Sequence, residues 1–163
     1  MYMTESQKKA IYDIIPKTFT INSETVSVSC FYENQMIPDG RDSEPFYSNA
    51  TYPLITLKYD DTDEFILDMG QVVMKTARLN INVFSTNIDN RGSGGNYING
   101  KVALDYMTRS ILETIENSYE SLYSSGIFIN DRIMGTKVMD LSTIATRKHV
   151  YRNKFRLNIT YEV

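Results

Sequence analysis

The sequence predicts an α+β fold in which a mostly antiparallel β-sheet is covered by one long helix and a short N-terminal helix. Several segments alternate apolar and polar residues with a period of two, which is typical of strands with one buried and one solvated face. Two other segments place apolar residues three and four positions apart, as amphipathic helices do. The 163 residues suit a single domain, 1–163, with one core.

The N-terminal helix is expected over residues 4–15. Thr4 and Gln7 have the spacing of a capping box, in which the two residues satisfy each other's backbone N–H groups. Apolar residues at helical spacing follow, and Pro16 ends the pattern. Two short alternating runs then flank the turn sequence Asn22-Ser23, so we expect one or two strands here.

The central segment is expected to supply a long loop and two strands. Residues 34–50 are mostly polar and include Pro38-Asp39-Gly40, which is turn chemistry. A strand is predicted over 53–60. A long antiparallel strand is predicted over 71–86, where buried-type residues alternate with asparagines.

Five carboxylates crowd the segment between these two strands: Asp60, Asp61, Asp63, Glu64 and Asp68. Oxygen ligands of this kind can hold Ca²⁺, but the segment lacks the spacing of a calcium-binding loop. The pattern instead favours a solvated turn that joins a strand ending at Asp60 to one beginning near Phe65. We therefore assign no metal and no cofactor.

The second half of the chain is expected to contain the main helix. A polar, glycine-rich loop over 87–99 leads into that helix, which is predicted over 100–124 from its apolar stripe and ends near Gly126. Further strands are expected at 127–129, 138–144 and 155–163. The last of these shows the most regular alternation in the chain.

The segment GNYINGKV, residues 95–102, is one residue short of the phosphate-binding pattern G-x-x-x-x-G-K-[ST]. Val102 stands where the pattern needs a hydroxyl for Mg²⁺, and about eight residues separate the preceding strand from Gly95. That strand also has one solvated face, whereas a phosphate loop follows a buried parallel strand. We expect Asn99-Gly100 to begin a helix; a phosphate-binding enzyme with Lys101 as the contact is the alternative.

Composition sets aside several classes of function. The formal net charge of −3 gives no general attraction to nucleic acid, although a local basic face stays open. A lone Cys30 and a lone His149 allow neither an internal disulfide nor a usual zinc site. No membrane span or signal peptide is expected, which favours synthesis in a cytoplasm. No catalytic residue is assigned, because no nucleophile motif occurs.

Basic residues gather near the C-terminus: Arg147, Lys148, His149, Arg152, Lys154 and Arg156. Alternation puts Arg152, Lys154 and Arg156 on one solvated face of the last strand. This face is expected either to be an ordinary solvated surface with cross-strand partners or to contact phosphates or an acidic protein. The acidic stretch 60–68 of a neighbouring subunit is one such partner.

The order of the expected elements resembles the tail terminator (tail completion) proteins of tailed bacteriophages. The likeness covers most of residues 50–163 and rests on the strand ending RLNINVFS, the polar loop, the long helix and the terminal strand in HVYRNKFRLNITYEV. It is one of pattern and length and carries no catalytic or ligand signature. Other neck or head-completion proteins of the same particles share similar small domains and are the alternative.

This resemblance implies a structural virion protein, made in the host cytoplasm, that forms a homohexameric ring at the tail–neck junction. Such a ring ends the polymerisation of the tail tube and joins the tube to the head connector, while genomic DNA passes through its lumen without sequence-specific binding. A ring needs two different complementary patches on each subunit. We expect these to include Asp60, Asp61, Asp63, Glu64, Arg147, Lys148, Arg152, Lys154 and Arg156, together with the loops 34–50 and 87–99.

Overall fold

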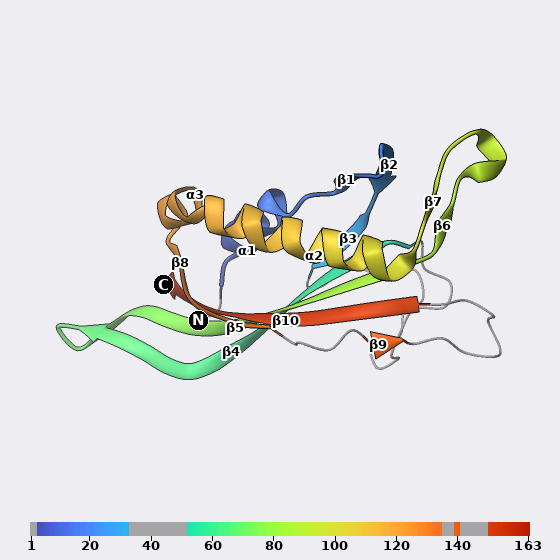
Figure 1. Cartoon of the computed structure of the whole chain (residues 1–163). Helices are drawn as coiled ribbons and strands as arrows, with labels where there is room; N and C mark the ends of the chain where they lie inside the picture. The colour runs from blue at the N-terminus through green and yellow to red at the C-terminus, as the bar shows by residue number, and fades with distance from the viewer. Residues whose placement is uncertain (1–2, 33–51, 135–138, 141–149) are drawn as a thin grey trace.

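The computed structural model describes residues 3–32, 52–134, 139–140 and 150–163; for 61–65, 131–134 and 139–140 it describes the backbone only. The elements follow the order α1 (Glu5–Ile14), β1 (Thr18–Ile21), β2 (Glu24–Ser27), β3 (Ser29–Tyr32), β4 (Leu54–Asp68), β5 (Gln71–Thr86), β6 (Ile88–Asp89), η1 (Arg91–Ser93), β7 (Tyr97–Ile98), α2 (Gly100–Asn117), α3 (Tyr119–Ser124), β8 (Ile127–Met134), β9 (Met139–Asp140) and β10 (Val150–Glu162). Figure 1 shows the helices gathered on one side of a long sheet.

The main sheet has the strand order β3-β4-β5-β10-β8, with β9 also pairing with β10. Its longest ladder joins β10 to β5, from Val150 opposite Thr86 to Glu162 opposite Met74. The pairs β4–β5, β5–β10 and β8–β10 are antiparallel, and β3 runs parallel to β4. The predicted α+β class with a mostly antiparallel sheet is therefore confirmed. Two small hairpins, β1–β2 and β6–β7, stand outside this sheet.

The core lies between this sheet and the helical layer formed by α1, α2 and α3. Every second residue of β10 faces it, from Tyr151 to Tyr161, and these side chains are nearly all excluded from solvent. The helix α2 adds a stripe at spacings of three and four, which includes Leu104, Met107 and Ile111. The apolar residues that recur every second position in the strands and every three to four positions in α2 thus pack together in one buried layer.

One polar contact crosses this layer and fixes α2 on β10. The Asn153 side-chain amide donates to Thr108 Oγ1 at 3.3 Å, and that hydroxyl donates to the Leu104 carbonyl at 2.8 Å. Gly100, the first residue of α2, lies so close to Tyr151 that an added Cβ would sit 2.6 Å from its ring. The start of α2 therefore requires a residue without a side chain.

The predicted N-terminal elements agree with the structure. Thr4 caps α1, and Thr4 and Gln7 form both hydrogen bonds of the capping box. Asn22 and Ser23 both adopt positive φ angles, of 49° and 65°, as the turn of the β1–β2 hairpin. This is the backbone that a two-residue hairpin turn needs.

The single helix predicted over 100–124 is wrong in one respect, because it is divided into α2 and α3 at Ser118. Ser118 has φ −106° and ψ 10°, outside the helical region. Its hydroxyl donates to the Thr114 carbonyl at 2.6 Å, so the side chain takes an acceptor of the preceding turn. The spacing of apolar residues does not reveal such a break, because Leu122 of α3 is still buried in the core.

The solvated turn predicted after Asp60 is also wrong, because β4 continues to Asp68 and the chain reverses at Met69-Gly70. Both turn residues have positive φ, 50° and 79°. β5 pairs with β4 on both sides of this segment, up to Asp61 and again from Phe65, with a register shift between them. Pairing with β5 before and after residues 62–64 thus keeps the chain extended despite the low strand propensity of the aspartates.

The polar loop predicted over 87–99 is instead the small hairpin β6–η1–β7. Its strands are only two residues long, too short for an alternating pattern to reveal. The predicted strand at 138–144 is represented by β9, and its other residues lie outside the described ones. The predicted loop over 34–50 also lies outside them.

Candidate functional site

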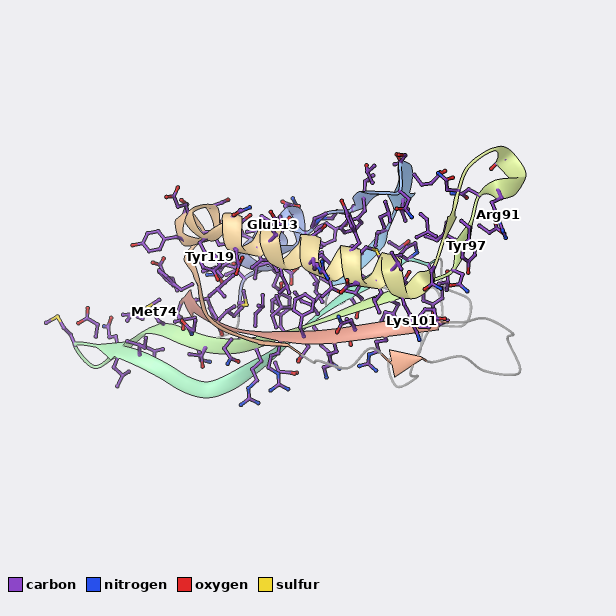
Figure 2. All side chains as sticks on the ribbon, viewed as in Figure 1. Met74, Arg91, Tyr97, Lys101, Glu113 and Tyr119 are labelled. Carbon is purple, nitrogen blue, oxygen red and sulfur yellow. The ribbon has the colours of Figure 1, made fainter. Side chains whose placement is uncertain are left out.

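The side of the sheet opposite the helices carries the predicted basic residues of β10. Arg152, Lys154 and Arg156 alternate with the buried residues of that strand, as the sequence predicts. Two further cations belong to the same side by the register of the neighbouring strands, Lys58 of β4 and Arg78 of β5. We call these five residues the basic face. The side chains that hang below the sheet in Figure 2 belong to this side.

Asparagines of β5 orient two guanidinium groups of the basic face. Arg152 Nε donates to Asn82 Oδ1 at 3.0 Å, and Arg156 Nε donates to Asn80 Oδ1 at 3.3 Å. The Asn80 amide in turn donates to Asp60 Oδ2 at 2.8 Å. Because each Nε is occupied, the terminal nitrogens of both guanidiniums are the donors left for a ligand.

The structure thus places Asp60 among the basic residues rather than on a separate patch, since it is also the register partner of Arg78. The side chains of Asp61, Asp63 and Glu64 are not described, although their backbone belongs to β4. Arg147 and Lys148 lie outside the described residues. Of the nine predicted interface residues, four are therefore placed, and all four share one side of the sheet.

A second candidate surface is the turn end of the β4–β5 ribbon, which extends beyond the helices at the left of Figure 1. Four apolar side chains are exposed there, and Met69 is 98% exposed. We call this group the ribbon tip: Ile66, Leu67, Met69 and Val72. The sequence held a signal for it, because neighbouring apolar residues such as Ile66 and Leu67 cannot both face one core.

A third candidate surface lies at the opposite end, where the β6–β7 hairpin projects and runs into α2 (Figures 1 and 2). Three large side chains are between 41% and 53% exposed there. We call this group the arm end: Tyr97, Val102 and Tyr106. The sequence analysis missed Tyr97 and Tyr106, because a tyrosine that alternates with polar residues or lies on a helix reads equally well as part of a core.

The β6–β7 hairpin carries its own ion pair. Arg91 Nε and Nη2 each donate to an oxygen of Asp89 at 2.9 Å, and the guanidinium lies 5.1 Å from the centre of the Tyr97 ring. These hydrogen bonds lower the pKa of Asp89 to about 2. Both charged groups are exposed, so the pair orients Tyr97 rather than adding much stability.

Glu24 of β2 holds this hairpin from the side. Its Oε1 accepts from the Asn96 backbone N–H at 2.7 Å, and its Oε2 accepts from the Asn90 amide at 3.3 Å. A Cβ added at Gly95 would sit 2.6 Å from Glu24 Oε1, so the hairpin passes directly against this carboxylate. The projecting arm is thus ordered by a contact between the two small hairpins.

Replacing Glu24 with alanine is expected to raise hydrogen exchange about tenfold or more at backbone amides 88–98. A charge-assisted hydrogen bond to a backbone N–H contributes about 1.5–3 kcal/mol, and its loss releases the hairpin without unfolding the core. Mass spectrometry of exchanged peptides measures this, with exposed Glu113→Ala as the matched control. Equal protection of 88–98 in both variants would show that Glu24 does not hold the arm.

Cys30 lies on β3 against the core. Burial raises the pKa of its thiol to about 11, and nearby Lys17 offsets only part of that rise. The thiol is therefore neutral near pH 7, which is the opposite of an activated nucleophile. Cys30 fits a structural position better than a catalytic one.

Alkylation of Cys30 by iodoacetamide is expected to be much slower than that of a free cysteine at pH 7.5. The rate is expected to climb until the pH nears the thiol pKa of about 11, because only the thiolate reacts. Mass spectrometry of the labelled protein gives the rate, and the same protein in urea is the control. A native rate that levels off below pH 9 would contradict this assignment.

The near-match to a phosphate loop forms the capped start of α2. Asn99 Oδ1 accepts from the Lys101 N–H at 2.9 Å, and Asn87 Oδ1 accepts from the Gly100 N–H at 2.8 Å. These side chains already occupy amides that a bound phosphate would need. The long strand predicted to precede this segment, β5, is antiparallel to both of its neighbours, unlike the strand before a phosphate loop.

Among the described residues, no group of three or more histidine, cysteine, aspartate or glutamate side chains is placed to hold a metal ion. The described helices include none that is both long and apolar enough to cross a membrane. No protein-family model matches the chain, and no curated protein sequence is significantly similar to it. The candidate surfaces are therefore judged on their geometry.

Proposed function

We propose that this chain is a structural subunit of a ring at the end of a phage tail tube, as the resemblance of its element order to tail terminator proteins implies. One observation carries the proposal: of the ten large apolar side chains exposed among the described residues, seven lie at two opposite ends of the molecule, the ribbon tip and the arm end. The ribbon tip lies on the β4–β5 hairpin, and the arm end is formed by the β6–β7 hairpin with the first turns of α2. Such surfaces are typical of protein interfaces.

The position of these two surfaces fits a ring in which each subunit contacts two neighbours. A two-fold dimer repeats one patch on both partners, whereas a ring joins two different patches head to tail. The ribbon tip and the arm end are different in composition and do not meet within one molecule, because they lie at opposite ends of it. In a ring each surface is covered by a different neighbour, because every subunit contacts two others.

In this proposal the ring would end the tail tube and contact both the tube protein and the proteins of the head connector. Genomic DNA would pass through the lumen without sequence-specific binding, and neither a cofactor nor catalysis is involved. A different ring of the neck, or a head-completion protein, is the closest alternative. It would share the same subunit architecture and differ in its partners.

The proposal is tested by light scattering of the purified protein over a concentration series, followed by negative-stain imaging. A closed ring is expected, with about six times the 18.8 kDa mass of the chain. The same measurement with added tail tube protein detects a ring that assembles only on its tube. A monomer under both conditions, at every concentration, would refute the proposal.

The basic face supports a second candidate function, the binding of a polyanion such as nucleic acid. Its five cations outnumber Asp60 and Glu162, the acidic residues described on that side. Asn82 and Asn80 accept from the Nε groups of Arg152 and Arg156. The terminal nitrogens of both guanidiniums are therefore available to a ligand. Phosphate groups are well matched to such guanidiniums, and contacts of this kind carry no sequence specificity.

A further inference from the structure

We propose that the ribbon tip of one subunit docks on the arm end of the next, with Asp68 beside Lys101. This inference rests on the proposed ring and specifies its contact. It names as occupant a second copy of this chain, because the chain itself carries both halves of the interface.

The four apolar side chains of the ribbon tip are exposed, and none of the described residues covers them. Leu67 is 54% exposed and Ile66 49% exposed, although both belong to the ladder between β4 and β5. An isolated two-stranded hairpin is only marginally stable in water, so apolar residues at its end gain most from a partner surface. The tight turn at Met69-Gly70 makes the tip narrow and places Met69 at its extreme end.

The arm end offers a surface that is suited to this tip. Val102 and Tyr106 are four residues apart on α2 and therefore adjacent on one side of the helix. Tyr97 lies just before that helix, with its ring oriented by Arg91. Tyrosine and arginine are enriched at the centres of interfaces, and flexible methionine fills irregular apolar surfaces well.

A pair of opposite charges would fix how the ribbon tip is positioned on the arm end. Asp68 is exposed within the ribbon tip, and Lys101 is exposed beside Val102. Among the described residues, no carboxylate pairs with Lys101, whose ammonium lies 5.5 Å from the Tyr151 ring. The neighbouring cations Arg91 and Arg109 are already paired, with Asp89 and Asp105. Among the described cations of this end, Lys101 is thus the one left for an incoming carboxylate.

The first experiment replaces Met69 with aspartate and, separately, Tyr106 with aspartate. Each change buries an unpaired charge if the docking is correct, so each is expected to raise the concentration at which rings form by at least tenfold. Tyr119→Asp, at the start of α3, is the control and is expected to assemble as the wild type does. Circular dichroism and thermal unfolding verify that every variant is folded.

The second experiment exchanges the two charges. Asp68→Lys and Lys101→Asp are each expected to weaken assembly, since each places like charges together at every contact. The chain that carries both changes restores opposite charges at each head-to-tail contact and is expected to assemble again. This rescue has no explanation in a structural defect of either single variant.

The outcomes separate the docking from the ring itself. Rings that form equally well in all variants, or a double variant that stays as defective as the single ones, would overturn the docking and leave the ring proposal intact. A wild-type chain that stays monomeric with and without tail tube protein would overturn both. Rings lost in the single variants and recovered in the exchanged chain are the expected result.

Discussion

Replacing Phe155 with alanine is expected to lower the free energy of unfolding by about 3–5 kcal/mol. Phe155 is only 1% exposed and occupies the middle of β10, between Ile81 of β5 and Met134 of β8. Its ring lies in the main core cluster with the residues of α2. Removal of so large a side chain leaves a cavity that strands held on both sides cannot close.

Denaturant unfolding followed by circular dichroism measures this loss. Lys154→Ala is the matched control, because it changes the next residue of the same strand but on the exposed side. That variant is expected to change the free energy of unfolding by no more than about 0.5 kcal/mol. Similar losses in both variants would contradict the assignment of Phe155 to the buried side and Lys154 to the exposed side of β10.

The second candidate function predicts a large change in salt dependence when Arg152, Lys154 and Arg156 are all replaced by glutamine. Each phosphate neutralised on duplex DNA contributes about 0.9 to the slope of log affinity against log salt. Loss of three contacts is therefore expected to make the slope shallower by about 2.7. Fluorescence anisotropy with a labelled duplex measures the slope across a salt series.

The control for this experiment removes the same amount of charge elsewhere. Lys9, Arg91 and Arg109 are exposed and each pairs with an aspartate of its own segment, so their replacement by glutamine leaves the basic face intact. This variant is expected to retain nearly the whole slope. A wild-type protein that does not bind DNA at low salt, or equal slopes in both variants, would reject the basic face as a polyanion site.

Local sequence signals identified many elements because their causes are local. The capping box of Thr4 and Gln7 needs only three residues of separation, and its hydrogen bonds are present as expected. The alternation in β5 gave its bounds, Gln71–Thr86, since one buried and one solvated side impose a period of two. The same alternation placed Arg152, Lys154 and Arg156 on a single side.

Other features depend on partners that are distant in the sequence. The sequence predicts a strand near Phe65, but the continuity of β4 through residues 61–64 depends on its pairing with β5 on both sides of that segment. Glu24 and Asn96 form a hydrogen bond although they are 72 positions apart. Because the sequence does not reveal this contact, it predicts a polar loop in place of the β6–β7 hairpin. The grouping of Asp60 with the cations of β10 likewise depends on β5, which lies between their strands.

The sequence by itself determined the class of fold, the helix caps and the side of each long strand that is buried, because periodicity and capping act over a few residues. Only the tertiary structure decided where the exposed residues gather. The ribbon tip and the arm end became opposite ends of one molecule through the pairing of β4 with β5 and the packing of α2 on the sheet. Such an arrangement arises from contacts between distant segments, which a local pattern cannot specify.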